Sequence, residues 1–165
     1  MMEVFDVVNE NDQLVGGATR EECHTNPKLI HRALHFTLVD KLSHKILITQ
    51  RSFELETDPG MWCFAGEHVK TQEAWKVAAL RGVKEEFGFS PIQVTELGHH
   101  VFAQPYQSEF VRLFVAEWHE EVIKPDPKEI AAVKWVTLEE LLASKATYSE
   151  MTQYWVKNID FSQAL

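Results

Sequence analysis

The segment that decides the fold spans residues 67–89 and reads EHVKTQEAWKVAALRGVKEEFGF. Its central part is typical of a helix, because alanine and leucine favour helices and the apolar side chains recur at spacings of three and four. We predict a helix over residues 72–87, with Thr71 as the N-cap residue and Gly88 as the residue that ends it. This is the most strongly patterned helix of the chain.

The predicted helix carries a set of charged side chains: Glu73, Arg81, Glu85 and Glu86. Two adjacent carboxylates repel each other unless a cation lies between them, and Mg²⁺ prefers oxygen ligands that it shares with substrate phosphates. Arg81 lies one turn before Glu85 and can hold a carboxylate by two hydrogen bonds. Glu73 lies about two turns before Arg81 and can brace the guanidinium. Taken alone, the adjacent acids would more often belong to a solvated helix face.

Most of the remaining chain has the alternating or β-rich pattern of strands. We predict strands at residues 4–8, 13–18, 33–39, 45–50, 62–65, 95–104, 110–118 and 130–136. Two more helices are predicted at residues 137–143, which open with the capping sequence Thr-Leu-Glu-Glu, and at residues 147–159. No linker or repeat divides the chain, so we predict one domain over residues 1–165.

Composition narrows the class of protein. A chain of 165 residues with 45% hydrophobic residues and five tryptophans can bury an ordinary globular core. A net charge of -9 argues against duplex nucleic acid and anionic membrane surfaces as partners. Two cysteines make no disulfide framework, and neither a signal peptide nor a long apolar run is recognisable. We therefore expect a cytoplasmic protein that does not bind membranes.

The segment quoted above resembles the signature of the Nudix hydrolases, which reads Gly, five residues, Glu, seven residues, then Arg-Glu-aliphatic-x-Glu-Glu-x-Gly-aliphatic. The matching positions are Glu73, Arg81, Val83, Glu85, Glu86 and Gly88, with Phe89 as an apolar equivalent. The resemblance implies an α/β fold, a Nudix-type α/β/α sandwich with a mixed β-sheet. It also implies divalent-metal-dependent cleavage of a diphosphate linkage in a nucleoside diphosphate derivative or a related small molecule.

The resemblance also implies roles for individual residues. The Gly66 carbonyl, Glu85 and Glu86 would be ligands of Mg²⁺ or Mn²⁺, which lowers the pKa of a bound water. The catalytic residues would be Glu85, Glu86, Arg81 and Glu73. The residues expected to contact the substrate are Glu67 and His68. The loops at residues 51–60 and 105–108 would set substrate preference. The sequence names neither the substrate nor the general base, and it leaves open whether the chain forms a homodimer.

Two positions depart from the signature. Glu67 stands where the signature has its first glycine, and Gly82 stands where it has the glutamate after the arginine. In the family that glutamate is a main metal ligand, and a glycine within a helix costs roughly 1 kcal/mol relative to alanine. One interpretation is that Glu67 or a loop carboxylate supplies the missing charge. The other is a catalytically impaired module that binds a nucleotide or another diphosphate without cleaving it.

A second resemblance involves histidines. His24, His31, His68 and Glu109 are similar to the metal-binding set of the isopentenyl-diphosphate isomerases, a branch with the same fold, and the N-terminal half also looks like that branch. Neutral imidazole with carboxylate suits Mn²⁺, Zn²⁺ or Fe²⁺. The isomerases need an acid/base cysteine where this chain has Gly66, so isomerase activity is the least favoured alternative. Ordinary loop positions are the competing interpretation for His24 and His31.

Overall fold

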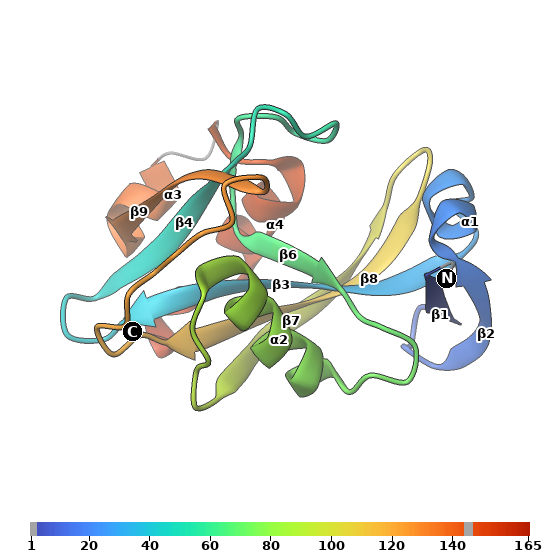
Figure 1. Cartoon of the computed structure of the whole chain (residues 1–165), viewed down its shortest axis with the longest axis horizontal. Coiled ribbons are helices and arrows are strands. Elements are labelled where there is room, and N and C mark those ends of the chain that lie inside the picture. The colour runs from blue at the N-terminus through green and yellow to red at the C-terminus, as the bar shows by residue number, and fades with distance from the viewer. Residues whose placement is uncertain (1–2, 144–146) are drawn as a thin grey trace.

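A computed structural model describes residues 3–143 and 147–165. Its elements, in chain order, are β1 (Val4–Val8), β2 (Leu14–Thr19), α1 (Arg20–Thr25), β3 (Ile30–Asp40), β4 (Lys45–Arg51), β5 (Trp62–Cys63), β6 (Ala65–His68), α2 (Trp75–Phe87), β7 (Val94–Ala103), β8 (Ser108–Glu117), β9 (Ile130–Thr137), α3 (Leu138–Ala143), α4 (Glu150–Asn158) and the 3₁₀ helix η2 (Phe161–Gln163). Figure 1 shows β3 running through the middle of the molecule.

The sheet is built around β3, and its strands are both parallel and antiparallel. β3 pairs in parallel with β8 over most of its length. It pairs antiparallel with β1 near its start, with β6 in its middle and with β4 at its end. β7 extends the sheet beyond β8, and β9 extends it beyond β4. The predicted mixed sheet is confirmed.

Helices cover both faces of this sheet, because each face carries its own apolar cluster. On one face α2 packs Ala79 and Val83 against Leu34 and Phe36. On the other face α4 contributes the buried Trp155 to a second cluster. In Figure 1 α2 and α4 accordingly lie on different sides of β3. This is the predicted α/β/α arrangement.

The start of the central helix differs from the prediction. α2 begins at Trp75, and its N-cap residue is Ala74, which makes no side-chain cap. Gln72 has a φ of 61°, which is not a helical value. The Thr71 hydroxyl donates instead to the carbonyl of Val4, at 2.8 Å. A long-range contact therefore replaced the expected cap, whereas the predicted end at Gly88 (φ 78°) is confirmed.

Two other predicted elements need correction. The strand expected at residues 62–65 is divided into β5, which pairs with β4, and β6, which pairs with β3. At Phe64, between them, the backbone N–H donates to the buried Thr152 hydroxyl at 3.1 Å. The last long helix begins at Glu150, later than the expected residue 147. The capping pattern before α3 is confirmed, since Thr137 and Glu140 exchange two hydrogen bonds.

Candidate functional site on the two faces of β6

The short strand β6 separates two groups of predicted site residues. Successive side chains of a strand point to opposite faces, so Glu67 points toward α2 while Gly66 and His68 face the other way. Val69 N–H donates to the Arg32 carbonyl at 3.1 Å, and bonded and non-bonded pairs alternate in an antiparallel ladder. The backbone N–H and carbonyl groups of Gly66 and His68 therefore point away from β3. Among the described strands β6 pairs with β3 alone, so the backbone groups of Gly66 on this edge have no strand partner.

Arg81 is the centre of the α2 face. Its guanidinium makes two hydrogen bonds of 2.9 Å to the carboxylate of Glu73 and one of 2.9 Å to Glu85. It also lies 3.2 Å from a Glu67 carboxylate oxygen and donates to the His68 carbonyl at 2.8 Å. These contacts, led by Glu73, hold the pKa of Arg81 above its ordinary value. One cation thus fixes three carboxylates and the end of β6.

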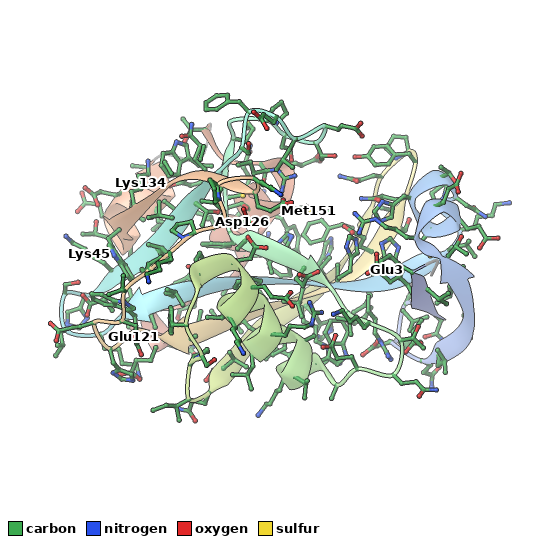
Figure 2. All side chains as sticks on the ribbon, viewed as in Figure 1. Glu3, Lys45, Glu121, Asp126, Lys134 and Met151 are labelled. Carbon is green, nitrogen blue, oxygen red and sulfur yellow. The ribbon has the colours of Figure 1, made fainter. Side chains whose placement is uncertain are left out.

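Glu86 occupies the most acidic surroundings on this face. Burial, followed by the charges of Glu129, Glu67, Asp126 and Glu85, raises the pKa of Glu86 to about 7. Glu129 and Asp126 lie on the connection between β8 and β9, where Figure 2 labels Asp126. Neither residue was predicted from the sequence, because nothing in the chain's local pattern links position 129 to the helix that ends at Phe87. A carboxyl group held this way gains strongly from a nearby cation.

The structure gives a packing reason for Gly82. A Cβ atom at this position would lie 2.7 Å from Cε1 and 3.0 Å from Cζ of Phe36, both closer than side-chain atoms normally approach. Phe36 is fully buried on β3. The glycine therefore allows α2 to approach the sheet closely. The packing of α2 against Phe36 offsets the conformational entropy that a glycine loses within a helix.

The opposite face of β6 brings together residues from four elements: His24 from α1, His31 from β3, His68 from β6 and Glu109 from β8. One donor atom from each of the three histidines lies within 4.8 Å of the others. A Glu109 carboxylate oxygen lies 3.5 Å from Nε2 of His31 and 3.5 Å from Nε2 of His68. The Phe5 ring stacks on His68 with centroids 4.8 Å apart and closes the cluster from the β1 side.

The electrostatics of this cluster suit a metal ion. His31 is fully buried, and neither of its ring nitrogens has a hydrogen-bond partner among the described residues. Burial and the neighbouring histidines lower the pKa of His24 to about 4, so its ring is neutral at pH 7. Burial would raise the pKa of Glu109, but His31 and His68 hold it well below its usual range. Buried orphan nitrogens beside an ionised carboxylate fit a divalent transition metal.

An ion-paired network fastens the N-terminal hairpin to the rest of the site. The Asp12 carboxylate accepts hydrogen bonds from Arg32 at 2.6 Å, Arg112 at 2.7 Å and the Trp75 indole at 3.0 Å. These three partners come from β3, β8 and α2. Asp12 lies in the turn between β1 and β2, and α1 follows β2 directly. The network therefore holds the segment that supplies His24. Asp12 was not among the site residues predicted from the sequence.

Comparison with known proteins decides the family. The model of the NUDIX domain matches residues 30–155. The chain belongs to the Nudix family. The family match begins after His24, so the N-terminal hairpin and α1 lie outside it.

Named Nudix relatives include both an isomerase and a hydrolase. The isopentenyl-diphosphate Δ-isomerase of Streptomyces coelicolor is 32% identical over 147 residues, which cover 84% of this chain and 73% of that protein. The uncharacterized Nudix hydrolase YfcD of Escherichia coli is 30% identical over 142 residues, 86% of this chain and 77% of that protein. The crystal structure of DR0079 from Deinococcus radiodurans shares the fold, with a TM-score of 0.78, 23% identity and coverage of 94% and 98% of the two chains.

The prediction of the fold class is thereby confirmed. None of the helices described here is both long enough and apolar enough to cross a bilayer.

Proposed function

We propose that this Nudix protein is a divalent-metal-dependent hydrolase that cleaves a diphosphate linkage in a nucleoside diphosphate derivative or a related small molecule. The observation that carries the proposal is the setting of Glu86, whose pKa is raised to about 7 by burial and by four neighbouring carboxylates. Such an arrangement is costly without a cation, and a cation that holds these oxygens can also hold the phosphates of a substrate.

In this proposal Glu85, Glu86 and the Gly66 carbonyl hold Mg²⁺ or Mn²⁺. Such an ion would neutralise phosphate charge and lower the pKa of a bound water. Arg81 keeps Glu67 and Glu85 in place, and Glu73 orients Arg81 through its paired hydrogen bonds.

Glu129 is the candidate for the charge that Gly82 lacks. After burial, the charge of Glu129 contributes most to the raised pKa of Glu86. A loop carboxylate can therefore take part without a side chain at position 82, where Phe36 leaves no room. This arrangement supports an active hydrolase over a catalytically impaired module that binds a diphosphate without cleaving it.

The histidine face favours a second metal ion and keeps the isomerase as a second candidate function. His24, His31, His68 and Glu109 would hold Mn²⁺, Zn²⁺ or Fe²⁺, as the resemblance to the isomerases implies. The cysteine that those enzymes need is replaced here by Gly66. A Cβ at that position would also lie 3.2 Å from His35 Cδ2, which is a tight contact. Hydrolysis therefore has the better support.

The test is an activity panel with purified protein, Mg²⁺ or Mn²⁺, several nucleoside diphosphate derivatives and isopentenyl diphosphate. We expect a phosphate-containing hydrolysis product from at least one nucleotide, and Glu86→Gln should reduce its rate by on the order of a hundredfold or more. Glu139→Gln, on the exposed first turn of α3, is the matched control and should leave the rate unchanged.

The other outcomes of the panel separate the alternatives. Binding of a nucleotide without any product would favour a module that does not cleave its ligand. Isomerisation of isopentenyl diphosphate, with no hydrolysis of nucleotides, would favour the isomerase. Equal activity of Glu86→Gln and the wild type would remove the basis of the proposal.

A further inference from the structure

His35 on β3 is a histidine whose tautomer is fixed by its surroundings. The indole N–H of Trp155 donates to His35 Nδ1 at 2.8 Å. An indole nitrogen can only donate, so Nδ1 must be unprotonated and the neutral ring must carry its proton on Nε2. Trp155 is fully buried in α4 and therefore holds the ring in a set orientation. The result is a neutral ring with a single N–H donor.

That donor has no partner within the described parts of the chain. No hydrogen bond to His35 Nε2 is formed among the described residues, and the His35 side chain is partly exposed. It lies directly beside Gly66, because a Cβ at that position would be 3.2 Å from His35 Cδ2 and 3.5 Å from Nε2. Gly66 is itself exposed. The oriented Nε2–H donor of His35 thus lies beside the exposed Gly66.

The surroundings of this donor are aromatic on one side. The Phe102 ring centroid lies 6.5 Å from that of His35 and 5.4 Å from that of Trp155. Phe102 belongs to β7, whose turn into β8 carries the half-exposed Tyr106. Figure 1 shows this turn and the loop between β4 and β5 rising on the same side of the sheet. Aromatic walls with one neutral donor suit a planar organic group.

In the proposed function the diphosphate belongs to the α2 face, where the acidic cluster around Glu86 would hold a cation for it. Glu109 lies on the same side of the sheet as His35, and burial together with Asp58, Glu109 and Glu150 raises the pKa of Tyr106. A ligand that passes the open edge of β6 would therefore place its diphosphate and its organic group on different sides.

We propose that His35 is a specificity-determining residue whose Nε2–H donates a hydrogen bond to an uncharged acceptor, a carbonyl oxygen or ring nitrogen, on the organic group of the ligand. Trp155 is the positioning residue that fixes the tautomer. This inference rests on the proposed function, since it assumes a diphosphate ligand bound with metal at Glu86. It adds the kind of group that the ligand carries, which is a heteroaromatic or carbonyl-bearing group such as a nucleobase.

Two substitutions separate a ligand contact from a structural role. Asparagine can place an acceptor where His35 has Nδ1, so His35→Asn keeps the partner of Trp155 but loses the outer donor. Glutamine can place an N–H where His35 has Nε2, so His35→Gln keeps the outer donor but loses the acceptor. A ligand contact predicts that only the asparagine variant binds poorly. A purely structural role predicts the reverse.

The probe is α,β-methylene-ADP with Mg²⁺, titrated calorimetrically into the full chain. We expect His35→Asn to weaken binding about tenfold, the value of one lost hydrogen bond, and His35→Gln to stay within about threefold of the wild type. His119→Asn, at an exposed histidine, is the matched control. Equal affinity of the asparagine variant and the wild type, or a loss confined to the glutamine variant, overturns the role of His35 and leaves the hydrolase proposal intact. Absence of binding by the wild type overturns the inference about His35 for this probe, whereas the hydrolase proposal is decided by the activity panel.

A spectroscopic signature checks the tautomer without reference to affinity. In a long-range ¹H–¹⁵N spectrum His35 should show a protonated Nε2 and an unprotonated Nδ1, and the Nε2 signal should move when the probe binds. Trp155→Phe should give a mixture of tautomers. A protonated Nδ1 in the wild type, or an Nε2 signal that the bound probe leaves unmoved, contradicts the inference.

Discussion

The two faces of β6 differ in how their residues come together and in the chemistry that results. On the α2 face, Glu67, Arg81 and Glu86 lie within twenty residues of one another and offer oxygen ligands. On the opposite face, His24, His31, His68 and Glu109 come from four elements and offer mostly nitrogen. Oxygen-rich sites suit Mg²⁺, whereas imidazole suits transition metals. The difference teaches that one alternating strand can present two chemically unlike groups of side chains, one on each face.

The largest expected effect concerns the packing of the α2 face. Gly82→Glu should lower the free energy of unfolding by at least about 3 kcal/mol, because it forces a side chain against Phe36 and buries a charge. Urea denaturation followed by circular dichroism measures this change. Val77→Glu, on the exposed side of the same helix, is the matched control. A stable Gly82→Glu protein with increased activity would instead identify Gly82 as a lost metal ligand.

The next effect tests whether the two faces bind metal independently. Glu109→Gln should weaken Mn²⁺ binding at the histidine face by about 10–100-fold, because the carboxylate lies 3.5 Å from two imidazoles. Glu86→Gln should leave that binding event unchanged and weaken the one on the α2 face. Calorimetric titration with Mn²⁺ resolves the two events. If either variant weakened both equally, the sites would not be separate.

The pH dependence of stability should have opposite signs on the two faces. The raised pKa of Glu86 means that, as pH increases from about 4.5 to about 7, the unfolded chain ionises before the folded one. Without metal, stability should therefore fall over this range by on the order of 2 kcal/mol after allowance for partial exposure, and Mg²⁺ or Glu86→Gln should remove the fall. Thermal denaturation at several pH values measures it.

Glu109 should behave in the opposite way. Its pKa is lowered by His31 and His68. Glu109 therefore stabilises the folded chain at pH values above the ordinary carboxyl pKa, and this stabilisation is lost as the pH falls through the lowered pKa. Glu109→Gln should flatten the acid limb of the stability curve and leave the neutral limb unchanged. If the neutral limb flattened instead, the assignment of the two limbs would be wrong.

The smallest effect concerns the fastening of the N-terminal hairpin. Asp12→Asn should cost roughly 1–2 kcal/mol of stability, because hydrogen bonds to two arginines lose their ionised acceptor. Asparagine tolerates the positive φ of 61° at this position, so the turn itself should survive. Mn²⁺ binding should weaken at the histidine face and not at Glu86. Glu10→Gln in the same turn is the control, and an equal loss there would argue against a specific role for Asp12.

The sequence by itself determined the parts of the protein that depend on local spacing. Helical periodicity placed Arg81 one turn from Glu85, and Gly88 ended α2 as expected, because a left-handed residue is needed there. Alternating apolar residues located the main strands, and the signature pattern led to the correct fold. The error at the start of α2 came from a long-range contact. The expected cap at Thr71 failed because its hydroxyl contacts Val4, which is distant in the sequence.

Only the tertiary structure decided which distant residues meet. It brought Glu129 to Glu86 and set Phe36 against Gly82. It also fixed the proton of His35 through Trp155, which lies far along the chain. None of these contacts leaves a periodic trace in the sequence, because they depend on strand register and on the closeness of helix and sheet. Spacing along the sequence predicts the helices and strands, whereas packing between them determines which side chains meet at the candidate site.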